Sequence, residues 1–131
     1  MLNDHERNKA FYDALALNIN ENTIVLDIGA GGGLLSMIAA KLGAKNVFAV
    51  ESNDILAQYL RLVIQQNNLS NKITVINKIS HELILGIDIP ERVDLIVTET
   101  FDCGLIGEGC LNNISHGKEN FLKPNGIVFI T

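Results

Sequence analysis

The sequence predicts an α/β fold, a Rossmann-like doubly wound parallel sheet of about five strands in the order 3-2-1-4-5. Two observations lead to this fold class. Short β-branched runs that are apolar on both faces alternate with amphipathic helical patterns, which is typical of a parallel sheet covered on both sides. A glycine-rich turn also follows the first strand directly, as in sheets that bind ligands at the carboxyl ends of their strands.

The elements follow from hydrophobic periodicity and from their start and stop signals. Asn53 or Asp54 is a suitable N-cap for the longest helix, and Gly43 a suitable C-cap for the helix before it. The segment "KPNG" at 123–126 predicts a turn before the last strand. Strands are expected at 23–29, 46–51, 72–77, 93–99 and 127–131, and helices at 3–17, 33–43, 53–69 and 108–121.

Length and composition indicate one soluble domain. The 131 residues are 47% hydrophobic and 19% charged, enough for a core, and the net charge of −5 argues against a nucleic-acid footprint. No apolar run approaches a membrane span, and two cysteines make no disulfide framework. We therefore expect a reducing, intracellular compartment. The last strand ends with the chain itself, so we expect residues 1–131 to be a fragment of a longer protein.

The stretch "VLDIGAGGG" carries the first motif. Glycines at Gly29, Gly31 and Gly33, preceded by Asp27, let the backbone turn tightly and let a ligand approach it. The dinucleotide fingerprint would need a glycine at position 34, where this chain has Leu34. The G-x-G-x-G spacing instead favours S-adenosylmethionine. A purely structural turn or a degenerate nicotinamide site are the alternatives.

Glu51 ends the second expected strand, in "FAVESN". An acidic residue about twenty positions beyond such a glycine loop can accept hydrogen bonds from both ribose hydroxyls. Alone it would be a solvated carboxylate, but after the glycine loop the ribose role is favoured.

The third motif is a pair of glutamates, Glu99 and Glu108, in the apolar, glycine-rich stretch "TETFDCGLIGEGCL". Glu108 at a helix start has a structural alternative, since it favours the helix dipole. A glycosidase-type acid/base pair does not suit a nucleoside-binding sheet. The partner that fits two carboxylates best is a guanidinium, with five N–H donors in a planar fork.

These residues resemble the protein arginine methyltransferases. "VLDIGAGGGLLSMIAAKLGAKNVFAVE" is similar to their cofactor-binding stretch and "ETFDCGLIGE" to their double-glutamate loop. "MLNDHERNKAFYDAL" resembles their cofactor-covering helix, and "FLKPNGIVFIT" the strand before their second domain. The "FD…GEG" wording resembles the divergent branch with tandem modules, whose members make monomethyl or symmetric dimethyl products.

The resemblance implies a residue set. Glu99 and Glu108 would hold the substrate guanidinium. Arg7 would hold the cofactor's carboxylate, Met1 would lie near its sulfonium, and Ser80 and His81 would fall in the adenine segment, although many relatives have an acidic residue in place of His81. The cofactor-binding set implied is Met1, Arg7, Asp27, Gly29, Gly31, Gly33, Glu51, Ser52, Ser80, His81 and Cys110, and no metal ligand is implied.

The expected function is methyl transfer from S-adenosylmethionine to protein arginine, leaving S-adenosylhomocysteine. The partner is then an arginine-containing protein in the cytoplasm or nucleus, not nucleic acid or membrane. The family's β-barrel, dimerisation arm and histidine loop lie downstream of this chain, so we expect residues 1–131 to bind cofactor but to be inactive alone. A small-molecule methyltransferase, a non-catalytic binding module and a nicotinamide dehydrogenase are the alternatives.

Overall fold

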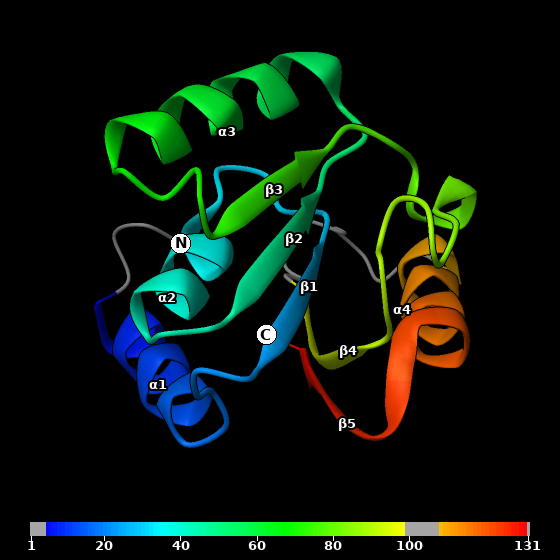
Figure 1. Cartoon of the computed structure of the whole chain (residues 1–131), viewed down its shortest axis with the longest axis horizontal. Coiled ribbons are helices and arrows are strands. Elements are labelled where there is room, and N and C mark those ends of the chain that lie inside the picture. The colour runs from blue at the N-terminus through cyan, green and yellow to red at the C-terminus, as the bar shows by residue number, and fades with distance from the viewer. Residues whose placement is uncertain (1–4, 99–107, 131) are drawn as a thin grey trace.

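The computed structural model describes residues 5–98 and 108–130 and arranges them in three layers. Five parallel strands form one sheet in the order β3-β2-β1-β4-β5, as predicted (Figure 1). The strands are β1 (Ile24–Ile28), β2 (Asn46–Val50), β3 (Ile73–Ile76), β4 (Val93–Thr98) and β5 (Leu122–Ile130). The helices are α1 (His5–Ala16), α2 (Leu34–Lys41), α3 (Asp54–Gln66) and α4 (Glu108–Phe121), with a 3-10 turn, η1 (Ser80–Glu82).

Alternate residues of the strands build two hydrophobic clusters, one on each face of the sheet. Val25 and Val47 point to the face covered by α1, α2 and α3, where Leu15, Leu35 and Leu60 pack. Leu26, Phe48 and Ile96 point to the other face, covered by Phe121 of α4 and Leu83 after η1. Because both faces are covered, the central strands β1, β2 and β4 are almost entirely buried and mostly apolar, which confirms the basis on which the parallel sheet was predicted.

Helix ends follow the sequence signals closely. Asn53 is the N-cap of α3, and its side-chain oxygen accepts a hydrogen bond of 3.0 Å from the N–H of Leu56. Gly43 follows the C-cap Leu42 of α2 with φ of +100°, a conformation that glycine adopts without strain. The helices therefore begin and end within a few residues of their predicted bounds.

The prediction of a turn at 123–126 is wrong. Those residues lie inside β5, where the register shifts from the pair Val93–Leu122 to the pair Leu95–Ile127. Strand β5 is at the sheet edge, where a proline without an N–H is tolerated in an irregular stretch. Proline and glycine therefore mark a bulge here, and the strand continues through it.

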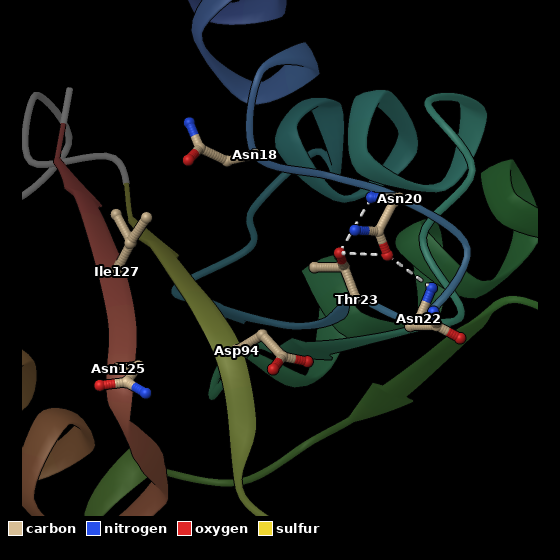
Figure 2. A pocket seen from close by; sticks show the side chains of 7 residues that line it. All are labelled: Asn18, Asn20, Asn22, Thr23, Asp94, Asn125 and Ile127. Atoms are coloured by element: carbon tan, nitrogen blue, oxygen red, sulfur yellow. Dashed lines mark hydrogen bonds between the residues drawn. The ribbon is translucent and has the colours of Figure 1, made fainter.

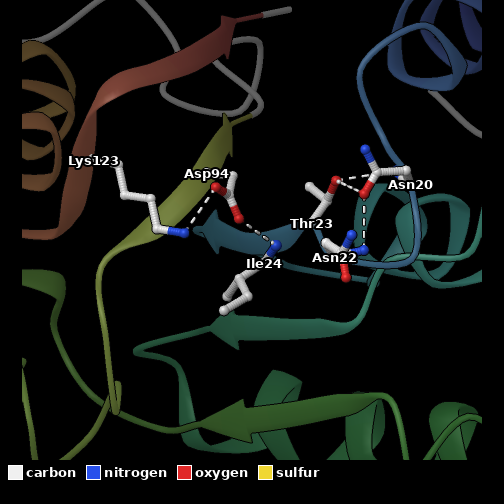
Figure 3. Close-up of polar contacts among 6 residues, drawn as sticks. All are labelled: Asn20, Asn22, Thr23, Ile24, Asp94 and Lys123. Carbon is white, nitrogen blue, oxygen red and sulfur yellow. Dashed lines mark hydrogen bonds and ion pairs between the residues drawn. The ribbon is translucent and has the colours of Figure 1, made fainter.

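A carboxylate fixes the amino-terminal edge of the sheet beside this bulge (Figure 3). Asp94 Oδ2 accepts a hydrogen bond of 2.9 Å from the N–H of Ile24, and Asp94 Oδ1 pairs with Lys123 Nζ at 3.0 Å. One side chain of β4 thus joins the start of β1 to the irregular part of β5. This contact holds the bulged segment against the sheet.

Candidate functional site

The candidate site lies where β1, β2 and β4 end at one edge of the sheet. The chain leaves β1 to return beside it as β2, whereas β4 pairs with the other side of β1, so the strand order reverses here. Ligands of open parallel sheets bind at such a reversal, outside the carboxyl ends of the strands. Of the predicted residues, the structure brings the glycine loop and Glu51 together at this point.

Glu51 holds the glycine loop. Its side chain is 8% exposed, and Oε1 accepts a hydrogen bond of 2.8 Å from the N–H of Gly31, while Oε2 accepts one of 2.9 Å from the N–H of Asn53. Two backbone donors therefore fix both oxygens, and each oxygen keeps a further lone pair for a ligand hydroxyl. Ser52, which lies between Glu51 and Asn53 in the sequence, is exposed.

The loop itself is shaped by glycine. Gly31 and Gly33 have φ of +55° and +83°, the left-handed region that other residues enter only with strain. A Cβ on Gly33 would lie 2.2 Å from Cδ1 of the fully buried Leu60, so a side chain at position 33 would force Leu60 to move. At Gly31 a Cβ would meet only the Gly29 carbonyl oxygen at 4.0 Å, so glycine is favoured there by the backbone conformation in which its N–H donates to Glu51.

Asp27 lies under the loop and does not face the open edge. It is 1% exposed within β1, and Ser36 Oγ in the first turns of α2 donates to its Oδ2 at 2.7 Å. Asp27 thus links the strand before the loop to the helix after it. Through this link, Asp27 can contribute to the predicted cofactor site by holding the glycine loop. Ser36 was missed by sequence reasoning, although the spacing of nine residues across the loop was a readable signal.

The segment after β3 carries a buried hydroxyl. Ser80 is 7% exposed, and its Oγ has no hydrogen-bond partner among the described residues. A buried hydroxyl without a partner is uncommon and points to a group that binds there. The 3-10 turn η1 that holds Ser80 was not predicted, because three residues leave no periodic pattern.

His81 is exposed in the same turn and contacts α4. Its ring lies against the ring of His116, with centroids 4.4 Å apart and an angle of 45° between the planes. His116 in turn meets the edge of Phe121, and its buried Nδ1 has no partner in the described part of the chain. Burial lowers the pKa of His116, and the His81 ring lowers it further against the opposing effect of Glu119.

The remaining predicted residues are placed by backbone only or lie outside the described residues. Glu108 is the first residue of α4 and Cys110 lies in its first turn, while Arg7 lies in α1; the structure does not describe these three side chains. Met1 and Glu99 lie outside the described residues, and Glu99 directly follows Thr98, the last residue of β4.

A hollow of about 260 Å³ opens at the opposite, amino-terminal edge of the sheet (Figure 2). Three of its polar residues bond to one another: Asn20 N–H donates to Thr23 Oγ1 at 2.9 Å, and Asn22 N–H donates to Asn20 Oδ1 at 2.8 Å. The full lining is Asn18, Asn20, Asn22, Thr23, Asp94, Asn125 and Ile127. None of the predicted site residues lines this hollow, so it is separate from the candidate site.

Comparison with known proteins now decides the family. The family model described as ribosomal protein L11 methyltransferase (PrmA) matches residues 4–128, almost the whole chain. The chain belongs to this methyltransferase family. Among the described residues there is no cluster of three or more potential metal-ligating side chains and no helix long and apolar enough to cross a membrane.

Arginine methyltransferases are prominent among its relatives, which confirms the resemblance seen in the sequence. The chain is 49% identical over 128 residues to the arginine N(omega)-methyltransferase of Streptomyces achromogenes subsp. streptozoticus, matching 98% of this chain and 36% of that protein. It is 40% identical over 131 residues to protein arginine N-methyltransferase 7 of Danio rerio, matching 94% of this chain and 19% of that protein. The chain therefore spans much less than half of these relatives.

A solved structure agrees in fold. The Trypanosoma brucei PRMT1 enzyme–prozyme heterotetramer with AdoHcy superposes with a TM-score of 0.82 and 32% sequence identity. The match covers 98% of this chain and 40% of that chain. The predicted fold class is confirmed by this likeness and by the strand order.

Proposed function

We propose that this chain is the cofactor-binding domain of an S-adenosylmethionine-dependent protein arginine N-methyltransferase. The single observation that carries the cofactor half is the Glu51 carboxylate bonded to Gly31 at the reversal of strand order. The acceptor half is supported by two glutamates, one directly after β4 and one opening α4. The relatives named as arginine methyltransferases support the same acceptor.

The described residues fit the proposed cofactor. Bound there, it supplies an electrophilic methyl group on a sulfonium. The further lone pairs of the Glu51 oxygens suit vicinal ribose hydroxyls. The Ser80 hydroxyl, which has no partner in the described part of the chain, suits a nitrogen of a base. Glycines at the turn leave the backbone open to a ligand, since a Cβ on Gly29 or Gly32 would meet nothing within 4 Å. We assign Ser52, His81, Arg7, Met1 and Cys110 to the same site as proposals.

Glu99 and Glu108 are proposed to grip the acceptor. A guanidinium delocalises its lone pairs, so its nitrogens are poor nucleophiles. Two carboxylates that bind one side of it draw positive charge toward the nitrogens they contact, which leaves the remaining nitrogen more nucleophilic. They also hold that nitrogen in line with the methyl group, and such positioning supplies a large part of the rate in bimolecular reactions.

An amine acceptor is the second candidate, because the matching family model is named for a methyltransferase of a ribosomal protein. An amine has no planar fork and needs no paired carboxylates, so the paired glutamates favour arginine. A peptide acceptor in which one arginine is replaced by lysine separates the two chemistries. A small-molecule acceptor or a non-catalytic binding role would show as no transfer to either peptide.

The glutamate pair gives the test of this function. In the full-length protein, Glu99→Gln and Glu108→Gln should each reduce methylation of an arginine peptide at least a thousandfold, and should change S-adenosylhomocysteine affinity less than threefold. Glu91→Gln, an exposed loop carboxylate, is the matched control and should keep full activity. Near-normal turnover in both glutamate variants would reject the proposed role of Glu99 and Glu108 in holding the guanidinium.

The proposal extends to the cellular context and the domain layout. Too few cysteines for a disulfide framework support the cytoplasm or nucleus. The proposed partner is an arginine-containing protein. The proposed product is monomethyl or symmetric dimethyl arginine, because the "FD…GEG" sequence resembles the divergent branch. Since relatives are much longer, we propose that residues 1–131 bind cofactor and that turnover needs further parts, a β-barrel domain among them.

A further inference from the structure

One peptide group at the site is held from both sides. It joins Ile28 to Gly29, at the point where β1 becomes the glycine loop. Its N–H, on Gly29, donates to the carbonyl of Val50 in β2 at 2.9 Å. Its carbonyl, on Ile28, accepts a hydrogen bond of 3.1 Å from the Thr98 hydroxyl in β4.

Thr98 is built for this contact. It is 3% exposed, it is the last residue of β4, and it is the register partner of Ile28 in the sheet. A side-chain hydroxyl buried at a strand end is unusual unless it has a partner, and here the partner is the carbonyl at the root of the loop. The residue after Thr98 in the sequence is Glu99.

The orientation of this peptide group decides where the loop goes. Gly29 follows it with φ of +72°, and two residues later the Gly31 N–H reaches the Glu51 carboxylate. Val50 fixes the N–H side of the group, and Ala30 N–H also donates to Val50 at 2.9 Å. Loss of the Thr98 hydroxyl removes a side-chain hydrogen bond from the carbonyl side, and a tilt of the group would carry the N–H of Gly31 away from Glu51.

We propose that Thr98 is a positioning residue that sets the glycine loop for cofactor binding and couples it to the strand that leads to Glu99. This rests on the proposed function for its link to catalysis, while its effect on the loop stands on the geometry alone. The hydroxyl acts through the Ile28 carbonyl and does not touch substrate.

Three variants of the full-length protein test this. Thr98→Val keeps the shape and removes the hydroxyl, Thr98→Ser keeps the hydroxyl, and Thr74→Val makes the same exchange at an exposed threonine of β3. Calorimetry should show Thr98→Val binding S-adenosylhomocysteine about fivefold to tenfold more weakly than wild type, the loss typical of one buried hydrogen bond. Thr98→Ser and Thr74→Val should bind within twofold of wild type.

A merely structural role predicts a different pattern. It would lower the melting temperature of Thr98→Val. The affinity for S-adenosylhomocysteine, measured at 20 °C on the protein that remains folded, would be unchanged. An affinity of Thr98→Val within twofold of wild type overturns the proposal, as does a Thr98→Ser variant as weak as Thr98→Val. If wild type binds S-adenosylhomocysteine but transfers no methyl group to arginine, the proposed function fails while the affinity series still decides the role of Thr98; a wild type that does not bind overturns both.

Discussion

The Glu51 carboxylate accepts a hydrogen bond of 2.8 Å from the backbone N–H of Gly31, twenty residues earlier in the chain. Its other oxygen accepts from the N–H of Asn53, whose side chain caps α3. The glycine loop and the start of α3 therefore share one carboxylate at the edge of the sheet. Proposed ribose binding depends on this carboxylate being fixed before the ligand arrives.

The first prediction concerns this carboxylate. Glu51→Gln replaces one acceptor oxygen by an NH₂ group that faces a backbone N–H and cannot accept from a ribose hydroxyl. Hydrogen bonds to charged groups contribute about 1.5–3 kcal/mol, so S-adenosylhomocysteine affinity should fall by about tenfold or more. Calorimetry measures this, with Glu21→Gln in an exposed turn as control. Equal affinity of Glu51→Gln and wild type would remove Glu51 from the site.

Ser80 gives a prediction in which affinity falls without a loss of stability. Ser80→Ala removes a buried hydroxyl that has no partner among the described residues, so the free energy of unfolding should stay the same or rise slightly. If the hydroxyl binds the cofactor's base, affinity for S-adenosylhomocysteine should fall about fivefold. Ser70→Ala, at an exposed position, is the control for both measurements. A less stable Ser80→Ala variant with normal affinity would mean that the hydroxyl is structural.

Gly33 and Gly32 make a matched pair for testing the loop. Gly33→Ala puts a Cβ 2.2 Å from Leu60 Cδ1 at a residue with φ of +83°, whereas a Cβ on Gly32 meets nothing within 4 Å. A non-glycine residue in such a backbone costs about 1–3 kcal/mol, before any displacement of Leu60. Urea unfolding should therefore show Gly33→Ala destabilised by at least about 1 kcal/mol. The stability of Gly32→Ala should be close to that of wild type. Equal stabilities would contradict the loop geometry.

His116 predicts a dependence of stability on pH. Its pKa lies below the ordinary value of 6.5 in the folded chain, chiefly because of burial and then because of His81. The unfolded state thus binds more protons as pH falls through 6.5, so the stabilising contribution of neutral His116 is present above that pH and is lost as pH falls through the lower folded pKa. Protonation of His116 would also place a positive ring 4.4 Å from the ring of His81, between η1 and α4.

Urea unfolding at pH 7.5 and 5.5 measures this loss. His116→Phe should show a smaller loss of stability between the two pH values than wild type, whereas His5→Gln, exposed on α1, should show the wild-type loss. The side chains to be considered around His116 are His81 and Glu82 of η1, Glu119 and Lys118 of α4, and Arg92, whose Nη1 donates to the Glu119 carbonyl. If His116→Phe loses as much stability between the two pH values as wild type does, the pH dependence belongs to one of these other side chains.

The sheet was predictable because burial on both faces leaves a direct mark in the sequence. All of β1 is buried, and the glycines and Glu51 mark the loop without any knowledge of tertiary contacts. The start of β5 was not predictable, since Pro124 and Gly126 signal a turn and only the pairing with β4 and the Asp94–Lys123 contact keep the segment in the sheet. Contacts between distant segments, such as Thr98 with Ile28 and His81 with His116, have no local pattern at all.

The central claim is that the acceptor nitrogen belongs to arginine. The most direct measurement incubates the full-length protein and S-adenosylmethionine carrying a deuterated methyl group with two peptides that differ only in one arginine or lysine, and locates the label by fragmentation mass spectrometry. We predict label on the arginine side chain of the first peptide and none on the second. Label on the lysine peptide, or on neither peptide while the protein binds the cofactor, would contradict the account.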